Sequence, residues 1–422
     1  MVLDSKSVPL LKTDKSRQGF PHLGIKLYPR KRLRLRNASI REWRTTVTSS
    51  QPLPGSFVHD LDTPTTLIDL DRLEKNIREW QAHADKCGVK FRSHIKTHKI
   101  PEIARMQVAA GARGIVCAKV SEAEPFAAAG IDDICIAYPI FGEMKWQRAA
   151  ALATQVRSLT VNCDSEEAAR GLSKAAANAG TTIHVQIDID SGLHRGGIPC
   201  EDTPAMERLA TVIRSLPGLR LAGITTYRSG SFPGAPGAKD AGHGEGQLLV
   251  DVANRLRGRG IEVDDVTAGS TPTGKWVAEV PGITEVRAGN YVFNDLMQLD
   301  HGIAAENQLA LSVLCTVAST NGKGRVTIDG GTKTFSGDAG GIGTGRAAPA
   351  AIARAVDRRI FVERLNEEHG MARTEEDVKL GEKIRFFPYH ACTCANLSDQ
   401  IVGFRGDRVE VVWSVRARGL RT

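Results

Sequence analysis

The sequence predicts a (β/α)8 barrel followed by a separate β-domain. Eight short β-branched runs, most of them separated by alanine-rich helical segments, are typical of such a barrel. After about residue 306 the long helical patterns give way to strand-like runs with Gly and Asp turns, which indicates a second domain. The length of 422 residues is also too great for one ordinary domain. The predicted barrel strands are residues 90–95, 114–118, 133–137, 158–162, 183–189, 219–225, 264–267 and 283–287.

A further β-run, residues 65–70, precedes these strands, and a charged amphipathic helix follows it to about Lys86. Because a doubly wound open sheet shows the same alternation of strands and helices, periodicity alone leaves the closure of the barrel open. We predict three regions along the chain. These are a basic, flexible arm over residues 1–58, the barrel over residues 59–305 and the β-domain over residues 306–422.

The net charge of +8 lies in the arm. Residues 1–58 carry 12 Lys or Arg and three acids, whereas the other 44 basic and 45 acidic side chains nearly cancel. A neutral body predicts no nucleic-acid partner, and the sequence has no run of about 18 apolar residues that would cross a membrane. The eight scattered cysteines indicate a reducing compartment. We expect a cytoplasmic protein, with mitochondrial import through the basic arm as the alternative.

The first predicted barrel strand runs into RSHIKTHK, residues 92–99. Strand alternation places His94 and Lys96 on one face, at the carboxyl end where barrel enzymes carry their catalytic groups. Desolvation there lowers a lysine pKa toward that of a usable amine nucleophile or Schiff-base former. The alternative is a surface lysine at the end of a strand, which is how we interpret Lys99.

Small residues follow the seventh and eighth predicted strands. VTAGSTPTGKW, residues 266–276, forms a loop whose backbone N–H groups suit a phosphate, and barrels of this kind bind phosphate at these two loops. In RAGNYVFND, Gly289 and Asn290 allow close backbone approach to the same anion. The sequence therefore predicts a phosphate site at this end of the barrel.

Two other glycine patterns carry less weight. Residues 269–275 fit most of the P-loop pattern, but Trp276 stands where the Mg²⁺-binding hydroxyl would be, which argues against an ATP site. The string GGIGTG, residues 340–345, resembles a dinucleotide fingerprint without a following helix. We interpret it as a loop.

PYHACTCANL, residues 388–397, places His390 and Cys392 two positions apart after a predicted strand. In an extended segment these two side chains point the same way, which suits two ligands of one Zn²⁺ ion. Two protein ligands leave coordination positions open, as a catalytic metal needs. Cys394 shares the alternation but suits the core equally well.

Eight strings in register, with a closing WSVRARG, run from Thr63 to Arg421. They are TPTTLIDLDRLEKNI, RSHIKTHKIPEIA, GARGIVCAKVSEAE, DIDSGLHRGG, AGSTPT, EVRAGNYVFND, EEHG and HACTCANL. Together they resemble the family of D-serine dehydratases and D-threonine aldolases. These are pyridoxal-phosphate enzymes with a fold related to alanine racemase, a barrel with a carboxy-terminal β-domain, and the resemblance implies that fold here.

The resemblance also assigns cofactor contacts. Lys96 matches the Schiff-base lysine of the family, and Arg195 matches an arginine that contacts the cofactor ring. Arg287 stands where the racemase branch has an arginine facing the pyridine nitrogen, and Tyr227 matches a tyrosine that lines the pocket. The cofactor-binding candidates are His94, Lys96, Arg195, Tyr227, Gly269, Ser270, Thr271, Arg287, Gly289 and Asn290.

His390 and Cys392 match the metal pair of the family. The dehydratase branch resembles HxC with zinc, and the aldolase branch resembles HxD with a harder ion such as Mn²⁺. Thiolate prefers Zn²⁺, so the cysteine favours the dehydratase on physical grounds as well. The resemblance thus implies a D-serine dehydratase, dependent on pyridoxal 5′-phosphate and zinc, that forms pyruvate and ammonia with Lys96 as its catalytic base.

Other functions stay open at this point. The main alternative is a metal-dependent aldolase or dehydratase that takes D-threonine or 3-hydroxy-D-aspartate and yields glycine plus an aldehyde, or oxaloacetate. A racemase and a non-catalytic pyridoxal-phosphate carrier are further alternatives. The family resemblance implies a homodimer.

Three positions depart from the family pattern. Ser93 replaces a usual proline, Arg228 a small residue or histidine, and Asn294 a frequent aromatic residue. We expect Arg228 and Asn294 on loops near the substrate. An added arginine suits a small-molecule substrate with a second acid group, a bulkier or anionic β-hydroxy-D-amino acid.

Overall fold

The computed structural model describes residues 53–228, 234–320, 322, 324–338 and 351–422. Most of the predicted basic arm and the glycine string at 340–345 lie outside these described residues. Residues 50–422 form one compact unit, and the description below concerns that unit alone.

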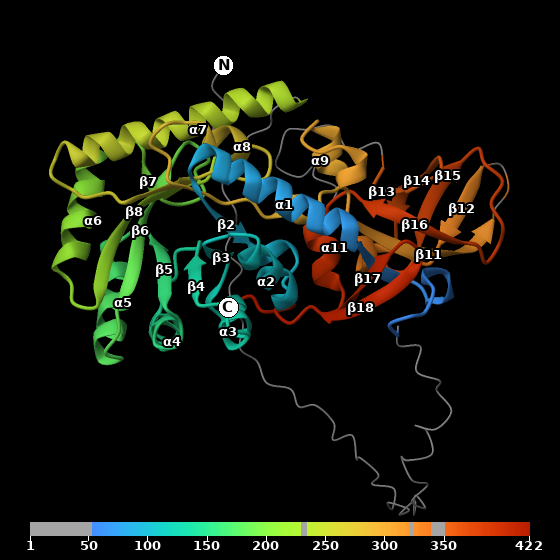
Figure 1. Ribbon diagram of the computed structural model, residues 1–422, viewed down its shortest axis with the longest axis horizontal. Coiled ribbons are helices and arrows are strands. Elements are labelled where there is room, and N and C mark those ends of the chain that lie inside the picture. The colour runs from blue at the N-terminus through green and yellow to red at the C-terminus, as the bar shows by residue number, and fades with distance from the viewer. Residues whose placement is uncertain (1–52, 229–233, 321, 323, 339–350) are drawn as a thin grey trace, which may run out of the picture. The chain divides into compact units, whose positions relative to one another are not determined.

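Eight parallel strands form a barrel (Figure 1). They are β2 (Lys90–His94), β3 (Gly114–Cys117), β4 (Asp133–Ile136), β5 (Ser158–Cys163), β6 (Ile183–Asp190), β8 (Leu219–Thr226), β9 (Asp265–Ala268) and β10 (Glu285–Val286). Their order is β5-β4-β3-β2-β10-β9-β8-β6, and β6 pairs back with β5, which closes the barrel. A short strand, β7 (Ile198–Pro199), pairs with the end of β6. This closure confirms the predicted (β/α)8 barrel over the open sheet.

Capping residues in the sequence account for where several barrel helices begin and end. In α5 (Glu166–Asn178) the Ser165 side chain accepts a hydrogen bond from the Ala168 N–H, and two glutamates occupy the first turn. In α1 (Leu70–Cys87) Asp69 caps the first turn, and Gly88 ends the helix in the left-handed conformation. The other helices of the unit are α2 (Pro101–Ala109), α3 (Val120–Ala128), α4 (Glu143–Ala153), α6 (Thr203–Ser215), α7 (Gly234–Arg257), α8 (Gly274–Ala278), α9 (Leu296–Asp300), α10 (Thr332–Phe335) and α11 (Ala391–Leu397), with 3₁₀ turns η2 (Val58–Asp60), η3 (Ile95–Thr97), η4 (Asn290–Val292) and η5 (Glu306–Gln308).

The β-domain contains the second sheet, which is mostly antiparallel. Its strands are β1 (Thr65–Asp69), β11 (Leu311–Thr320), β12 (Arg325–Ile328), β13 (Ala353–Ala355), β14 (Ile360–Leu365), β15 (Gly370–Thr374), β16 (Lys383–Pro388), β17 (Gln400–Arg405) and β18 (Arg408–Ser414). They follow the order β12-β15-β14-β13-β16-β11-β1-β17-β18, and β11 also pairs with β12. Six of these strands therefore form a closed ring, to which β1, β17 and β18 are added.

Strand β1 differs from its predicted place. It lies within the range predicted for the barrel, residues 59–305, yet it pairs antiparallel with β11 and parallel with β17. The physical reason is that both flanks of this short strand find backbone partners in the β-domain sheet, where Leu67 and Ile68 are fully buried. The chain thus begins in the β-domain, builds the barrel, and returns.

A single buried apolar cluster extends from the barrel into the β-domain. It includes Val286 and Phe293 from the barrel side, and Leu311, Ala391 and Cys394 from the β-domain. Because these side chains exclude water together, the domain junction is part of the core rather than a hinge. This packing fixes α11 against the barrel.

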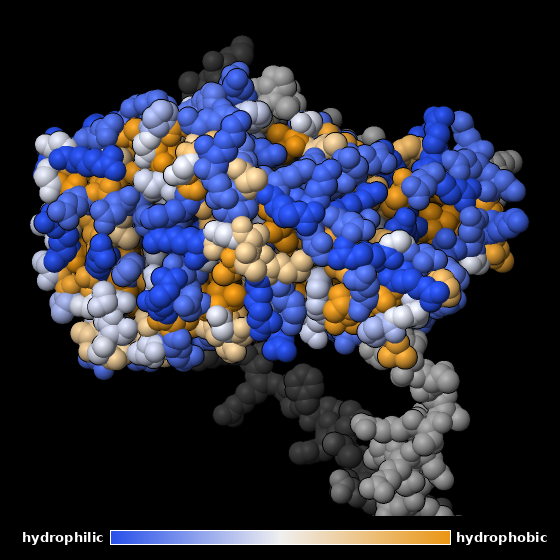
Figure 2. All heavy atoms as spheres, viewed as in Figure 1, coloured by the Kyte–Doolittle hydropathy of each residue, from blue (hydrophilic) through white to orange (hydrophobic). Residues whose placement is uncertain are grey.

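On the face of the molecule drawn in Figure 2, exposed apolar side chains do not gather into one large patch. Figure 2 shows a face that is mostly hydrophilic, with hydrophobic residues in small separate groups. Among the described residues, no helix combines the length and the apolar character needed to cross a lipid bilayer.

Candidate active site

The carboxyl ends of five barrel strands bring the predicted cofactor residues together. His94 ends β2, and Arg195 follows β6. Tyr227 follows β8, while the segments 269–271 and 287–290 follow β9 and β10. This is the end of a (β/α)8 barrel at which active sites are built.

Lys96 lies one turn beyond the strand that was predicted to carry it. β2 ends at His94, and Ile95–Thr97 form η3, in which the Lys96 backbone N–H lies 3.4 Å from His94 Nδ1. The Lys96 side chain is exposed, so the predicted half-buried strand position is wrong. The backbone passes from β2 into η3 after His94, so strand alternation does not extend to Lys96.

Lys99 also differs from its predicted place. It was interpreted as a surface lysine, but only 9% of it is exposed and its backbone has a positive φ of 54°. Its Nζ lies 3.6 Å from the buried Glu122 carboxylate. Burial raises the pKa of Glu122, while Lys99 and Lys96 act to lower it.

The charged groups around His94 are cationic. Burial lowers the pKa of His94 well below its ordinary value, and Lys96, Arg287 and Arg195 lower it further. His94 therefore stays neutral in a positive field, which suits an anionic cofactor and substrate. The Arg195 guanidinium lies 4.4 Å from the centroid of the Tyr227 ring, a cation–π contact.

Arg287 is held firmly at the mouth of the barrel. Its side chain is only 8% exposed, donates to Gln186 Oε1, and has its Nε 3.5 Å from Glu285 Oε1. Asp188, on β6, lies in the same field: burial raises its pKa to about 6, while Arg195 and Arg287 act to lower it. A fixed guanidinium suits a planar, electron-accepting ligand ring.

The two predicted phosphate loops are tied to each other. Thr271 Oγ1 accepts hydrogen bonds from the backbone N–H groups of Gly289 (3.3 Å) and Tyr291 (3.0 Å). A Cβ at position 289 would lie 2.8 Å from the His94 carbonyl oxygen, so only glycine fits there. Asn290 donates to Asp295 Oδ2 (2.6 Å), and its buried Oδ1 has no protein partner among the described residues. A narrow cradle that a Cβ at position 289 would fill fits a phosphate-bearing cofactor.

In the loop after β9, two backbone N–H groups that were predicted to face a phosphate already have protein acceptors. The Gly269 N–H donates to Glu245 Oε1 (3.3 Å), and the Ser270 N–H donates to Thr273 Oγ1 (3.2 Å). Gly269 has φ +91°, which glycine adopts without strain. The predicted loop is thus present, but part of its donor set is turned toward a buried carboxylate on α7.

His390 and Cys392 are close together, but for a different reason from the predicted one. They do not alternate along an extended segment, because α11 begins at Ala391, with His390 at its N-cap and Cys392 in its first turn. His390 Nδ1 lies 2.7 Å from Asp338 Oδ2, and Cys392 Sγ lies 3.2 Å from Thr97 Oγ1. The metal motif of the β-domain therefore touches the turn that carries Lys96.

The donor chemistry of this pair fits a metal. With Nδ1 hydrogen-bonded to Asp338, the Nε2 of His390 remains as the ligand atom, an arrangement common around zinc. Burial disfavours the His390 cation, but Cys392, Asp338 and Asp295 raise its pKa to about 11. Within the described ranges, no group of three or more His, Cys, Asp and Glu side chains is arranged to hold a metal. The pairing of this imidazole and this thiol as metal ligands therefore stays a prediction.

Three further residues that the sequence singled out are buried, which contradicts the substrate-side position predicted for Asn294. Cys394 is fully buried, and its thiol donates to the Thr334 carbonyl (3.2 Å). Asn294, expected near the substrate, is 5% exposed and donates to the carbonyls of Tyr291 and Gln308. Ser93 is also buried, with its hydroxyl 3.2 Å from the Tyr291 hydroxyl.

Sequence reasoning missed several residues of the site. Asp338, Thr97 and Glu245 each contact a predicted site residue, yet none stands in a motif with it. Asp338 is 52 positions before His390, and Glu245 is 24 positions before Gly269. No local spacing connects such pairs, because the fold alone brings them together.

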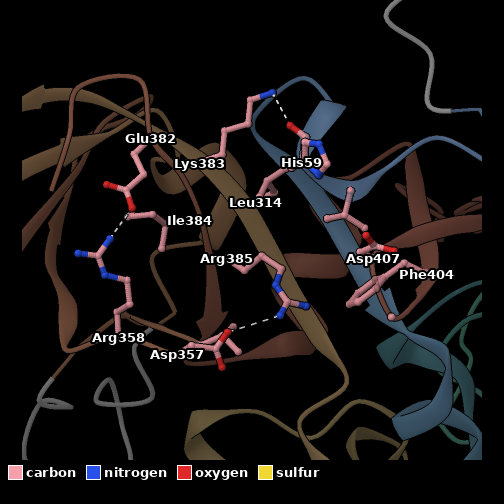
Figure 3. Close-up of a pocket in the computed structure, with 13 residues that line it drawn as sticks. His59, Leu314, Asp357, Arg358, Glu382, Lys383, Ile384, Arg385, Phe404 and Asp407 are labelled. Atoms are coloured by element: carbon pink, nitrogen blue, oxygen red, sulfur yellow. Dashed lines mark hydrogen bonds and ion pairs between the residues drawn. The ribbon is translucent and has the colours of Figure 1, made fainter.

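The β-domain also has a cavity of about 310 Å³. Figure 3 shows that its charged side chains already have partners, such as Arg358 with Glu382 (2.6 Å) and Arg385 with Asp357 (3.7 Å). None of its 13 lining residues is a predicted site residue. This cavity is separate from the site at the mouth of the barrel.

The fold, a parallel barrel joined to an antiparallel β-domain, is that of the fold-type III pyridoxal-phosphate enzymes. The family model for the alanine racemase N-terminal domain matches residues 68–296, and the model for a D-serine dehydratase-type domain matches residues 310–404. The chain therefore belongs to the family in which an alanine racemase-like barrel is joined to a dehydratase-type β-domain.

Several curated relatives cover most of this chain. A D-threonine aldolase from an Arthrobacter species is 35% identical over 87% of this chain and 95% of the relative. The D-threo-3-hydroxyaspartate dehydratase of Delftia sp. strain HT23 is also 35% identical, over 79% of this chain and 91% of the relative. The D-serine dehydratase of Dictyostelium discoideum is 25% identical, over 81% and 93%.

Solved structures agree with the fold. A D-threonine aldolase from Filomicrobium marinum superposes with a TM-score of 0.80 at 31% identity, covering 87% of this chain and 98% of the other. The Delftia dehydratase superposes with a TM-score of 0.77 at 31% identity, covering 85% and 98%. An alanine racemase from Clostridium difficile, at 14% identity and a TM-score of 0.62, shares the fold alone.

Proposed function

We propose that this chain is a lyase that depends on pyridoxal 5′-phosphate and a divalent metal, and that removes the β-hydroxyl and the amino group of a β-hydroxy-D-amino acid. One observation carries the proposal. The Cys392 thiol lies 3.2 Å from the hydroxyl of Thr97, the residue next to Lys96. A base for the α-proton and ligands for a metal that activates the β-oxygen therefore belong to one site, although they come from two domains.

The barrel residues would hold the cofactor and move the proton. Lys96 would bind the cofactor through its side-chain amine, Arg287 would meet its ring, and the loops at Ser270 and Gly289 would surround its phosphate. When bound, pyridoxal phosphate supplies an electron sink for the pair left at Cα. Lys96 Nζ would accept the α-proton, because Lys96 lies in the turn that follows the carboxyl end of β2, where barrel enzymes carry their catalytic groups.

The β-domain residues would hold the metal. His390 Nε2 and Cys392 Sγ would be its protein ligands, with Asp338 fixing the imidazole through Nδ1. An ion held by these residues would supply Lewis-acid chemistry to the β-hydroxyl, whose loss as hydroxide is otherwise difficult. The pairing of a thiolate with an imidazole suits zinc better than manganese, and this supports elimination.

We propose that the preferred substrate is an acid of the 3-hydroxy-D-aspartate type and that D-serine is a poorer one. The relatives named for D-threonine and D-threo-3-hydroxyaspartate are 35% identical to this chain, and the one named for D-serine is 25% identical. Arg228 is exposed directly after β8, next to Tyr227, and its guanidinium suits a second substrate carboxylate. The prediction of a D-serine dehydratase is therefore less well supported than the alternative prediction of a lyase for D-threonine or 3-hydroxy-D-aspartate.

Product analysis tests the proposal. The full-length enzyme, supplied with pyridoxal 5′-phosphate and Zn²⁺, is given D-threo-3-hydroxyaspartate, D-serine and D-threonine separately. We expect oxaloacetate and ammonia in equal amounts from the first substrate at the highest kcat/KM, with one water lost and one taken up. We expect C392A to lose most of this activity, and a C200A control to keep it. Glycine and glyoxylate as the products would overturn the proposed elimination.

A retro-aldol lyase is the second candidate, because a D-threonine aldolase is among the relatives at 35% identity. In that reaction the metal ligands would assist loss of the β-hydroxyl proton instead of loss of hydroxide. Equal amounts of glycine and acetaldehyde from D-threonine, with Mn²⁺ restoring activity better than Zn²⁺, would support it.

A further inference from the structure

A buried carboxylate on α7 lies behind the phosphate loop. Glu245 is 0% exposed, and three donors converge on its carboxylate. Oε1 accepts from the backbone N–H of Arg228 (2.9 Å) and of Gly269 (3.3 Å), and Oε2 accepts from Thr273 Oγ1 (2.9 Å). Arg228 belongs to the loop after β8, whereas Gly269 and Thr273 belong to the loop after β9. One side chain thus joins two loops at the mouth of the barrel.

Glycines on α7 make this reach possible. A Cβ at Gly242 would lie 2.6 Å from Trp276 Cβ and 2.7 Å from the Thr273 carbonyl, and one at Gly246 would lie 2.8 Å from Val280 Cγ2. Because these positions lack side chains, α7 packs closely on the loop and on α8, and the short glutamate arm reaches the backbone of both loops. The cost is a glycine-rich helix, which α7 tolerates by packing.

The network continues to the phosphate cradle. Thr273 Oγ1, which donates to Glu245, accepts from the Ser270 N–H (3.2 Å) and lies 3.1 Å from Ser270 Oγ. The direction of the Ser270 and Gly269 amides is therefore set by the carboxylate. On the other side, the same carboxylate holds the Arg228 backbone. The ring of the preceding residue, Tyr227, lies 4.4 Å from the Arg195 guanidinium.

We propose that Glu245 is a positioning residue that shapes the cofactor-phosphate cradle and couples it to the substrate-side loop carrying Tyr227 and Arg228. This inference rests on the proposed pyridoxal-phosphate chemistry. Glu245 then has two opposite effects on cofactor affinity. Its negative charge repels the phosphate, whereas its hydrogen bonds hold the loops that surround the phosphate. The two effects are separable, because glutamine keeps the oxygen acceptor for both N–H groups and offers an NH₂ donor to Thr273.

The charge effect depends on pH. Burial raises the pKa of Glu245 to about 7, and its hydrogen bonds to Arg228, Thr273 and Gly269 together with the Arg228 charge act to lower it. Arg228 is the charged side chain that acts on it, from the β8 loop, and the β9 loop presents the hydroxyls of Ser270 and Thr273. Above pH 7 the ionised carboxylate repels the phosphate dianion, so cofactor affinity falls as the pH rises.

The test measures binding rather than turnover. The full-length chain and its E245Q, E245A and D251N variants are freed of cofactor and titrated with pyridoxal 5′-phosphate and with pyridoxal between pH 6 and 8.5, using cofactor absorbance. Asp251 is an exposed acid on the same helix and serves as the matched control. Comparing variants at one pH cancels the ionisation of the ligand itself.

We expect E245Q to bind pyridoxal 5′-phosphate roughly tenfold more tightly than the wild type at pH 8.5 and about equally at pH 6, since one repulsive charge is removed. E245A should bind it roughly tenfold more weakly than E245Q, because two loop amides lose their acceptor. Pyridoxal, which lacks the phosphate, should bind all four proteins alike. The substrate KM should rise in E245A and not in E245Q.

Two other outcomes are distinguishable. If the wild type binds pyridoxal 5′-phosphate but E245Q and E245A match D251N at every pH, Glu245 is only a core residue and the inference is overturned. If pyridoxal responds to E245Q as strongly as the phosphorylated cofactor does, the effect is not on the phosphate, which also overturns it. Failure of the wild type to bind either ligand would instead overturn the proposed function.

Discussion

The two ends of the barrel use charged side chains in opposite ways. At the amino-terminal end, Arg92 of β2 is 2% exposed, with its Nε 3.1 Å from Glu285 and its Nη1 on Asp133. Arg113 adds contacts to both acids, at 3.4 Å to Glu285 and 3.6 Å to Asp133. The three arginines Arg92, Arg287 and Arg113 hold the pKa of Glu285 below its ordinary value in spite of burial.

At the carboxyl end, two to four residues further along the same strand and turn, the charges are not balanced in this way. His94 is held neutral by burial and by the nearby cations Lys96, Arg287 and Arg195. One end therefore satisfies its charges internally and stabilises the fold, while the other keeps a positive field for a ligand. One strand and the turn after it therefore carry a structural segment at Arg92 and, directly after it, a functional segment from His94 to Lys96.

Replacing the lysine at the mouth should separate these roles most strongly. We expect K96A to lower kcat by roughly 10³- to 10⁴-fold, because the α-proton loses its base. Its free energy of unfolding should change by less than about 0.5 kcal/mol, since the side chain is exposed. Steady-state kinetics and urea unfolding measure both, with the exposed Lys174 as a K174A control. A K96A enzyme of near-normal activity would contradict the proposed role.

Replacing the arginine at the other end should do the reverse. We expect R92M to lower the free energy of unfolding by about 3–5 kcal/mol, because the buried Glu285 and Asp133 both lose their most buried partner and keep only the longer contacts of Arg113 and other arginines. Urea denaturation followed by circular dichroism measures it. The matched control is R220M, which breaks the exposed Arg220–Asp264 pair and should cost less than about 1 kcal/mol. Equal losses in the two variants would remove the distinction between buried and surface pairs.

Replacing Asp338, whose carboxylate contacts His390, tests whether a charged group at the carboxyl end of the barrel supports ligand binding instead of stability. We expect D338N to weaken metal binding by roughly 10- to 100-fold, because His390 loses the group that orients its ring. Competition with a chromophoric zinc chelator measures the affinity. D357N, an exposed aspartate on the β-domain, should leave it unchanged. Unaltered zinc affinity in D338N would show that Asp338 does not support the metal.

The smallest expected effect concerns His98, a buried histidine that follows η3 at the carboxyl end of β2. Burial lowers the pKa of His98 from 6.5 to about 3, and its hydrogen bonds to Gln107 and Ile100 act to raise it. The unfolded chain therefore binds a proton that the folded chain does not, and stability is lost as the pH falls from 6.5 toward 3. We expect a slope of up to about 1.4 kcal/mol per pH unit from this residue.

Urea unfolding between pH 6.5 and 5 measures that slope. H98N keeps an acceptor for the Ile100 N–H (3.0 Å) and removes the titrating ring, so its slope should be flatter than that of the wild type. An equally steep slope in H98N would assign the pH dependence to other groups.

The sequence by itself determined the parts that depend on local pattern. The eight barrel strands, the change of texture after about residue 306, and the motifs around Lys96, Gly269, Gly289 and His390 all follow from periodicity, glycine placement and residue order. Such features are readable because side-chain alternation and backbone freedom act over a few residues.

Only the tertiary structure decided which residues meet. It closed the barrel through β5 and β6, took β1 into the other sheet, and placed Thr97 against Cys392 across the domain junction. It also buried Lys99, placed Lys96 on η3 instead of on β2, and set Glu245 behind the phosphate loop. These outcomes depend on contacts between residues far apart in the chain, whose energies no local pattern contains.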